Sequence, residues 1–191
     1  LTHQHMTNPF SDLFELYPTA SWVIFAIIWI AVATGAVAGL SAAPWVPTKR
    51  REKKALVKSL EIKPGQIIYD LGCGTGTLLF ALAKENTKAN FIGCEISVIP
   101  YLIAKLRALK YKNVQIKYKN LFKQSIDNAD IIIIFLLTKA YDRLKEKFKA
   151  ELKDEALIAV QGWAMENIKP SKVLKTDKAL PFYIYKGSDF R

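Results

Sequence analysis

A glycine-rich segment, Asp70 to Gly76, holds the residues of this chain whose types and spacing are best suited to binding a cofactor. It reads Asp-Leu-Gly-Cys-Gly-Thr-Gly. Alternate glycines let the backbone turn tightly and approach a ligand closely, because no Cβ atom blocks the way. An apolar run, 67–69, precedes the segment, and residues 78–83 after it have the composition of a helix. A strand, a glycine loop and a helix in this order hold nucleotide-like cofactors in open α/β sheets.

The spacing of the glycines distinguishes between two classes of cofactor. A dinucleotide site needs the pattern G-x-G-x-x-G, but here the third glycine comes one residue early and Thr77 occupies its place. An acid in front of the loop, Asp70, also suits a cationic ligand better than a diphosphate. The resulting D-x-G-x-G-x-G pattern resembles motif I of the seven-strand, class I S-adenosylmethionine methyltransferases. The resemblance implies S-adenosylmethionine as the cofactor.

A second carboxylate lies at the distance where such folds place an acid for the ribose. Glu95 ends the apolar segment 91–94 and lies 19 residues beyond Gly76. The resemblance implies that Glu95 accepts hydrogen bonds from ribose hydroxyls, that Asp70 lies near the methionine amino group or orders the loop, and that Ile96 packs on the adenine. The cofactor-binding residues predicted in this way are Asp70, Gly72, Cys73, Gly74, Gly76, Thr77, Glu95, Ile96, Asn120 and Leu121.

Apolar segments and segments of helical periodicity alternate along the rest of the chain. Residues 130–136 form an almost continuous apolar run, which is typical of a central parallel strand covered on both faces. Together these patterns predict a Rossmann-like α/β fold with a mostly parallel seven-stranded sheet and helices on both faces. Strands are predicted over 67–69, 91–95, 114–118, 130–136, 156–161, 173–176 and 182–185, and helices over 50–61, 78–83, 97–110 and 140–152.

The N-terminal region differs in composition from the remainder. Residues 22–40 carry no charge, and as a helix they would span about 28 Å, close to the thickness of a hydrocarbon core. We therefore predict a flexible N-terminus over 1–20, a single transmembrane helix over 21–43 and a catalytic domain over 44–191. Trp22 and Trp45 flank the apolar run, as interfacial aromatic residues do, and a basic cluster at 49–54 follows it.

The distribution of charge supports an anionic partner. Residues 1–48 have no Lys or Arg, whereas residues 49–191 hold all 28 basic and 15 of the 17 acidic residues, a net charge of +13. The positive-inside rule then places the catalytic domain on the cytoplasmic side of a membrane, or on the inner mitochondrial membrane in a eukaryote.

The apolar N-terminal segment has two alternative interpretations besides a transmembrane helix. One is a cleavable signal peptide, which acidic rather than basic flanking residues disfavour, and the other is a helix buried in the domain core.

The cysteines do not indicate a metal site. Cys73 and Cys94 have neither metal-ligand spacing nor a neighbouring histidine cluster. We expect small buried thiols in a reducing compartment and no bound metal.

Several short segments together resemble one branch of the seven-strand methyltransferases, the lysine methyltransferases of ATP synthase c-subunit and adenine nucleotide translocase. The segments are Trp45-Val46-Pro47-Thr48 after the apolar region, Glu95-Ile96-Ser97, and Asn120-Leu121-Phe122. The chain departs from that family at Asn120, where Asp is usual, after the fourth strand, and at Gln161-Gly162-Trp163. Candidate residues lining the acceptor site are Trp45, Pro47, Thr48 and Trp163; no catalytic base is identified.

The resemblance implies an enzyme that methylates protein lysines, acting on membrane or membrane-adjacent proteins, with the lipid bilayer as a partner. Methylation of a lipid headgroup or a lipophilic small molecule is the alternative that the apolar N-terminal segment equally explains. A nucleic-acid methyltransferase is disfavoured, because no N/D-P-P-Y motif follows the fourth strand. A protein that only binds S-adenosylmethionine is a further alternative.

Overall fold

The computed structural model describes residues 18–40, 56–57, 59–175 and 180–191. Seven strands form one sheet in the order β3-β2-β1-β4-β5-β7-β6. Strands β1 to β5 are parallel, and β7 is antiparallel to β5 and to β6. The strands are β1 (Ile67–Leu71), β2 (Asn90–Glu95), β3 (Val114–Tyr118), β4 (Ile131–Ile134), β5 (Leu157–Gln161), β6 (Lys172–Leu174) and β7 (Phe182–Lys186).

The apolar run over 130–136 forms the centre of this sheet. Strand β4 lies between β1 and β5, and all four of its isoleucines are buried. Because side chains alternate along a strand, Ile131 and Ile133 join one hydrophobic core and Ile132 and Ile134 the other. The prediction of a central strand covered on both faces is confirmed.

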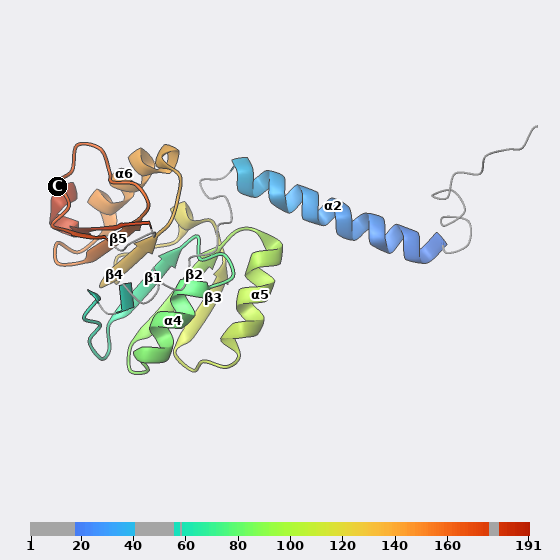
Figure 1. Ribbon diagram of the computed structural model, residues 1–191, viewed down its shortest axis with the longest axis horizontal. Coiled ribbons are helices and arrows are strands. Elements are labelled where there is room, and N and C mark those ends of the chain that lie inside the picture. The colour runs from blue at the N-terminus through green and yellow to red at the C-terminus, as the bar shows by residue number, and fades with distance from the viewer. Residues whose placement is uncertain (1–17, 41–55, 58, 176–179) are drawn as a thin grey trace, which may run out of the picture.

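Helices cover both faces of the sheet (Figure 1). Helix α4 (Thr77–Glu85) and helix α5 (Val98–Ala108) contribute to the first core, and helix α6 (Tyr141–Glu151) contributes to the second. The fourfold spacing in 140–152 matches this packing, since Ala140, Leu144, Phe148 and Leu152 are all buried. The predicted Rossmann-like fold is therefore confirmed for the described domain.

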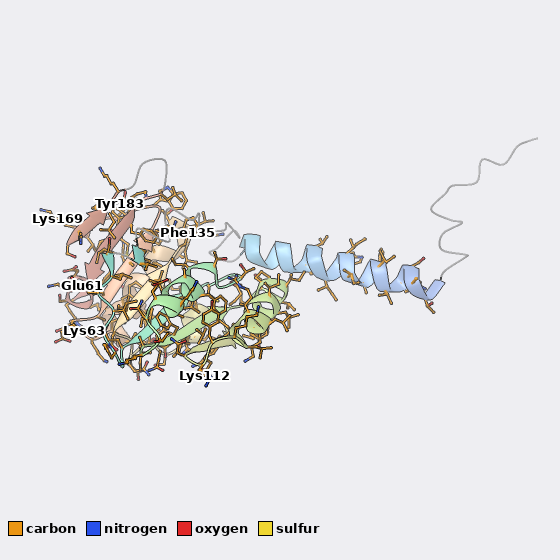
Figure 2. The ribbon with its side chains drawn as sticks, turned by 60° about the horizontal axis from the view of Figure 1, so that its bottom comes forward. Glu61, Lys63, Lys112, Phe135, Lys169 and Tyr183 are labelled. Carbon is orange, nitrogen blue, oxygen red and sulfur yellow. The ribbon has the colours of Figure 1, made fainter. Side chains whose placement is uncertain are left out.

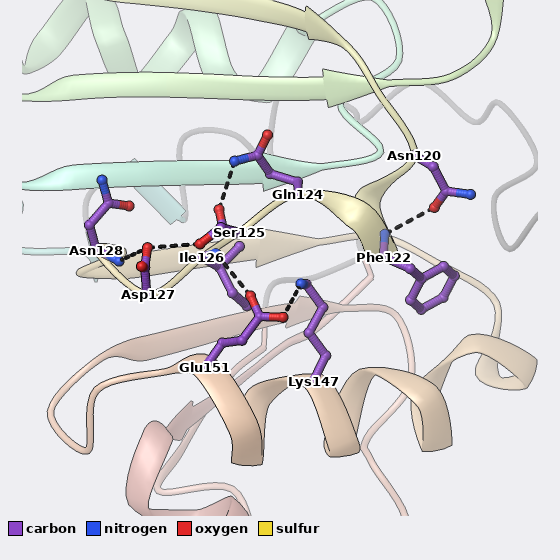
Figure 3. A network of polar contacts seen from close by, with 9 residues as sticks. All are labelled: Asn120, Phe122, Gln124, Ser125, Ile126, Asp127, Asn128, Lys147 and Glu151. Atoms are coloured by element: carbon purple, nitrogen blue, oxygen red, sulfur yellow. Dashed lines mark hydrogen bonds and ion pairs between the residues drawn. The ribbon is translucent and has the colours of Figure 1, made fainter.

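A partly buried polar contact joins helix α6 to the loop between β3 and β4. The Glu151 carboxylate accepts a hydrogen bond from the backbone N–H of Ile126 at 3.1 Å and pairs with the Lys147 ammonium at 2.5 Å (Figure 3). The Lys147 side chain is 7% exposed, so its charge needs this partner. The loop that leads into β4 is thereby held against α6.

The apolar N-terminal segment forms a separate helix. Helix α2 (Pro18–Leu40) lies outside the sheet-and-helix layers and contacts α5 (Figure 1). The predicted membrane segment, 21–43, overlaps this helix, and residues 41–43 are outside the described part of the chain. Among the residues described, none of the helices combines the length and the apolarity needed to cross a membrane. The prediction of a single transmembrane helix is therefore not confirmed.

Candidate active site

The glycine loop leaves β1 and enters α4 at the carboxyl edge of the sheet. Gly72, Gly74 and Gly76 all have positive φ angles, of 85°, 55° and 73°. This left-handed backbone favours glycine over any other residue. A Cβ atom at Gly76 would also lie 2.4 Å from the Phe80 ring. The backbone shape of the loop therefore favours glycine at all three positions.

Glu95 lies beside this loop, at the end of the neighbouring strand. Its carboxylate accepts a hydrogen bond from the backbone N–H of Gly74 at 2.9 Å. The other oxygen accepts from the N–H groups of Ile96 at 2.9 Å and Ser97 at 2.7 Å. A carboxylate offers about four acceptor positions, so these three bonds leave capacity for a ribose hydroxyl. Glu95 both fits the predicted role and connects the loop to β2.

Asp70 is the second buried carboxylate at this edge. It is 6% exposed and lies on β1 opposite Gly93 of β2 and Ile133 of β4. Burial, and then the nearby negative charge of Glu95, raise the pKa of Asp70 from 3.8 to about 7. Two close buried carboxylates favour a cationic ligand, because a positive charge between them offsets their repulsion. This arrangement fits the ammonium group and the sulfonium of S-adenosylmethionine.

The two cysteines are free and buried. Burial raises the pKa of the Cys73 thiol well above its ordinary value and that of the Cys94 thiol to about 11. Both side chains are therefore protonated and poorly nucleophilic at neutral pH. Cys73 belongs to the loop as a packing residue, since its sulfur would lie 2.8 Å from a Cβ atom at Gly93. Within the described residues, His, Cys, Asp and Glu form no group that could hold a metal ion.

Arg107 of helix α5 contacts the glycine loop at Thr75 and helix α4 at Phe80. The sequence did not reveal this role. Its guanidinium donates a hydrogen bond to the Thr75 carbonyl at 2.7 Å and lies 4.7 Å from the centre of the Phe80 ring. An arginine 32 residues from Thr75 carries no local sequence signal for this contact. Arg107 is a positioning residue, because it acts on the loop.

We expect Arg107→Gln to weaken binding of S-adenosylhomocysteine about tenfold, since the variant loses both the charged hydrogen bond and the ring contact. Isothermal titration calorimetry measures the effect. Lys105→Gln removes one exposed charge from the same helix and serves as the control. Equal affinities for Arg107→Gln and the wild type would show that the loop holds its shape without the guanidinium.

The remaining predicted cofactor residues lie along the same edge. Ile96 follows β2 and is half-buried, so part of its side chain is available to an adenine ring. Asn120 precedes the short 3-10 turn Leu121–Lys123, and its side-chain oxygen accepts from the Phe122 N–H at 3.0 Å. An amide oxygen can accept a second bond, so this local bond is compatible with the predicted adenine contact. Figure 3 shows Asn120 directed toward Phe122.

Two aromatic side chains meet where β4 and β5 end. The Phe135 and Trp163 rings are stacked, with centroids 6.5 Å apart and planes inclined by 22°. Trp163 is 47% exposed, so a ring face is accessible to solvent. The single proton of the Tyr141 hydroxyl is shared between the carbonyls of Leu136, at 3.4 Å, and Trp163, at 3.2 Å, which ties the two strand ends together. Figure 2 labels Phe135 at this end of the domain.

The structure thus brings most of the predicted site residues to one edge. The glycine loop follows β1, Glu95 ends β2 and Ile96 follows it, Asn120 follows β3, and Trp163 follows β5. Phe135 and Tyr141 complete the aromatic side of the site and were missed, because their pairing with Trp163 depends on the order of strands. The predicted acceptor residues Trp45, Pro47 and Thr48 lie outside the described residues.

A mostly parallel sheet in this order, with an antiparallel β7, a D-x-G-x-G-x-G loop and an acid ending the second strand, defines a class I S-adenosylmethionine-dependent methyltransferase. Residues 70–172 match the family model described as the ANTKMT methyltransferase domain. This match covers more than half of the chain, which therefore belongs to that family.

Two known proteins illustrate the similarity. A protein-lysine N-methyltransferase from Saccharolobus islandicus is 28% identical over 139 residues, which cover 70% of this chain and 85% of the relative. The crystal structure of an RNA methyltransferase from Salinibacter ruber with S-adenosyl-L-homocysteine superposes with a TM-score of 0.69. It is 19% identical and covers 74% of this chain and 93% of that one, so it supports the fold alone.

Proposed function

We propose that this enzyme is a protein-lysine N-methyltransferase. The similarity to the Saccharolobus islandicus enzyme supports this function most directly, because it extends over 85% of a protein-lysine N-methyltransferase. The aromatic pair of Phe135 and Trp163 supports it independently. A stacked pair with an exposed ring face, placed at the edge where the cofactor residues gather, suits a cationic side chain.

The cofactor, when bound, supplies a methyl group on a positively charged sulfur. In the proposed reaction the neutral amine of lysine forms the new N–C bond while the C–S bond breaks, and the electron pair of that bond stays on sulfur. The lysine ammonium loses one proton to solvent before attack, and the product nitrogen then carries the positive charge as a methylammonium while S-adenosylhomocysteine leaves as the neutral thioether. The chain contributes mainly position. Asp70 and Glu95 hold the cofactor, and Phe135 and Trp163 orient the acceptor.

Trp163→Ala is expected to raise the KM for a lysine-containing peptide about fivefold, equivalent to about 1 kcal/mol, with the affinity for S-adenosylhomocysteine unchanged. The reason is the loss of a ring face from the acceptor side only. Steady-state kinetics and calorimetry measure the two quantities. Trp163→Phe keeps an aromatic ring and should recover most of the loss. A parallel loss of cofactor affinity in Trp163→Ala would assign the ring to the cofactor side.

We also propose that the enzyme works at a membrane, with its catalytic domain on the cytoplasmic side. Helix α2 supports this proposal through large apolar side chains that stand out around it, all of those described being at least 45% exposed (Figure 2). A helix that is apolar all round favours lipid or a protein interior over water. The side proposed for the domain follows from the basic cluster at 49–54, which lies outside the described residues. The protein substrate is then one embedded in, or close to, the membrane.

The test of the acceptor uses S-adenosylmethionine labelled on the methyl group. The full chain is incubated with it and with membranes of its host, and the label is then separated into protein, lipid and nucleic acid. We expect label in protein, with methyl-lysine recovered after acid hydrolysis. Label confined to the lipid extract would replace the proposed function by methylation of a headgroup or lipophilic molecule. Glu95→Ala provides the inactive control.

A further inference from the structure

Helix α5 presents an apolar stripe to solvent. Ile99, Leu102, Ile103 and Leu106 recur at the spacing of one helix face. The structure turns this face away from the sheet, with exposures of 39%, 51%, 41% and 67%, whereas the buried side chains of α5 are Ala104 and Ala108. Small residues thus pack toward the first core, and large apolar residues stay outside. Leu109 extends the stripe and is 80% exposed.

The segment of chain that contains this stripe carries charge of one sign. Residues 96–126 contain seven Lys and Arg and no Asp or Glu. Lys105 on α5 is exposed, as are Lys110 and Lys112 after it. Large exposed apolar side chains bordered by polar residues mark interaction sites. Here the border is cationic, so the partner must combine an apolar surface with negative charge.

We infer that the outer face of α5, defined by Ile99, Leu102, Ile103, Leu106 and Leu109, lies in the surface of an anionic lipid bilayer. Amphipathic helices with basic borders bind membranes in this way, with apolar side chains below the headgroups and basic side chains among them. A second copy of this chain fits less well, because two such faces would bring together positive charge only. Helix α2 contacts α5 and is itself apolar and exposed, so both helices offer apolar surface on the same side of the domain.

This contact would orient the enzyme on the membrane. Helix α5 begins next to Glu95, whose carboxylate accepts from the Ser97 N–H, so its first turn lies at the cofactor edge. A bilayer along α5 therefore borders the site. Contact of α5 with lipid does not depend on which acceptor receives the methyl group.

A fluorescent reporter on α5 tests the inference in the full chain. Leu106→Cys is labelled with an environment-sensitive dye, and Val173→Cys on β6, at the opposite end of the sheet, is the matched control, since Val173 is 39% exposed. The native cysteines are buried, and labelling of the unmodified protein measures their background. The probe is a phosphatidylcholine vesicle with about one-third phosphatidylglycerol and nitroxide on the acyl chains.

We expect the vesicles to shift the emission of the dye at 106 to shorter wavelength and to quench it several-fold, with little change at 173. Lys105→Glu with Lys110→Glu in the labelled protein should reduce this quenching, because both charges are exposed. Equal quenching at 106 and 173 would overturn the inference. A dye at 106 that is already shielded from aqueous iodide without vesicles would also overturn it, since protein would then cover the face; sedimentation would identify a second copy.

Discussion

Glu95→Ala is expected to weaken binding of S-adenosylhomocysteine by at least about a hundredfold, equivalent to about 3 kcal/mol. The carboxylate accepts three backbone hydrogen bonds, from Gly74, Ile96 and Ser97. Its removal takes away the proposed acceptor for the ribose and also the bond that connects the glycine loop to β2. Calorimetry with S-adenosylhomocysteine measures the loss, and methyl transfer should fall with it.

The control for this variant is Glu85→Ala. Glu85 is an exposed glutamate in the last turn of α4, away from the glycine loop. Its replacement therefore removes one negative charge without touching the loop. Glu95→Gln separates the two roles of the carboxylate, because an amide keeps one acceptor oxygen and loses the charge. Cofactor affinity in Glu95→Ala equal to that of Glu85→Ala, with both proteins folded by circular dichroism, would show that the cofactor binds elsewhere.

Asp70→Asn is expected to weaken the binding of the cofactor and, at the same time, to stabilise the fold. The pKa of Asp70 is about 7 in the folded protein against 3.8 ordinarily, so the folded state holds this proton more tightly than the unfolded chain does. The stabilisation from that proton is present at low pH and is lost as the pH rises from about 4 to about 7. Asparagine is neutral throughout and avoids this loss.

Chemical unfolding measures the effect on stability. The free energy of unfolding of Asp70→Asn should exceed that of the wild type by about 2–4 kcal/mol near pH 8, and by less near pH 5. Asp142→Asn is the control, since the Asp142 side chain is 96% exposed. If the variant were less stable than the wild type near pH 8, the fold would favour the ionised form of Asp70 over the protonated form, contrary to this prediction.

Cofactor binding should show the opposite dependence on pH. If the ammonium of S-adenosylmethionine pairs with the ionised form of Asp70, as proposed, affinity should fall as the pH drops below about 7, by at most about tenfold per pH unit. Asp70→Asn should bind weakly at every pH in this range. Calorimetry from about pH 5 to about pH 8 measures both curves. A wild-type affinity independent of pH would remove Asp70 from the binding of the ammonium.

Local patterns in the sequence determined the elements of the fold and half of the site. The segment 114–118 is strand β3 as predicted, and the apolar run that contains β4 predicted a central position that the sheet order confirms. The positive φ angles of the loop glycines, and Glu95 at the end of β2, also follow from spacing along one stretch of chain. These features can be predicted from the sequence because they depend on residues that are close together in the chain.

Tertiary structure alone decided which distant residues meet. The Arg107 contact with Thr75 and the stacking of Phe135 on Trp163 depend on how α5 and β5 are placed beside other elements. The same holds for the apolar face of α5. Its periodicity predicts a helix with one apolar side, but only the packing of Ala104 and Ala108 against the sheet turns that side outward. Periodicity describes a single element, whereas the side that becomes buried depends on its partners.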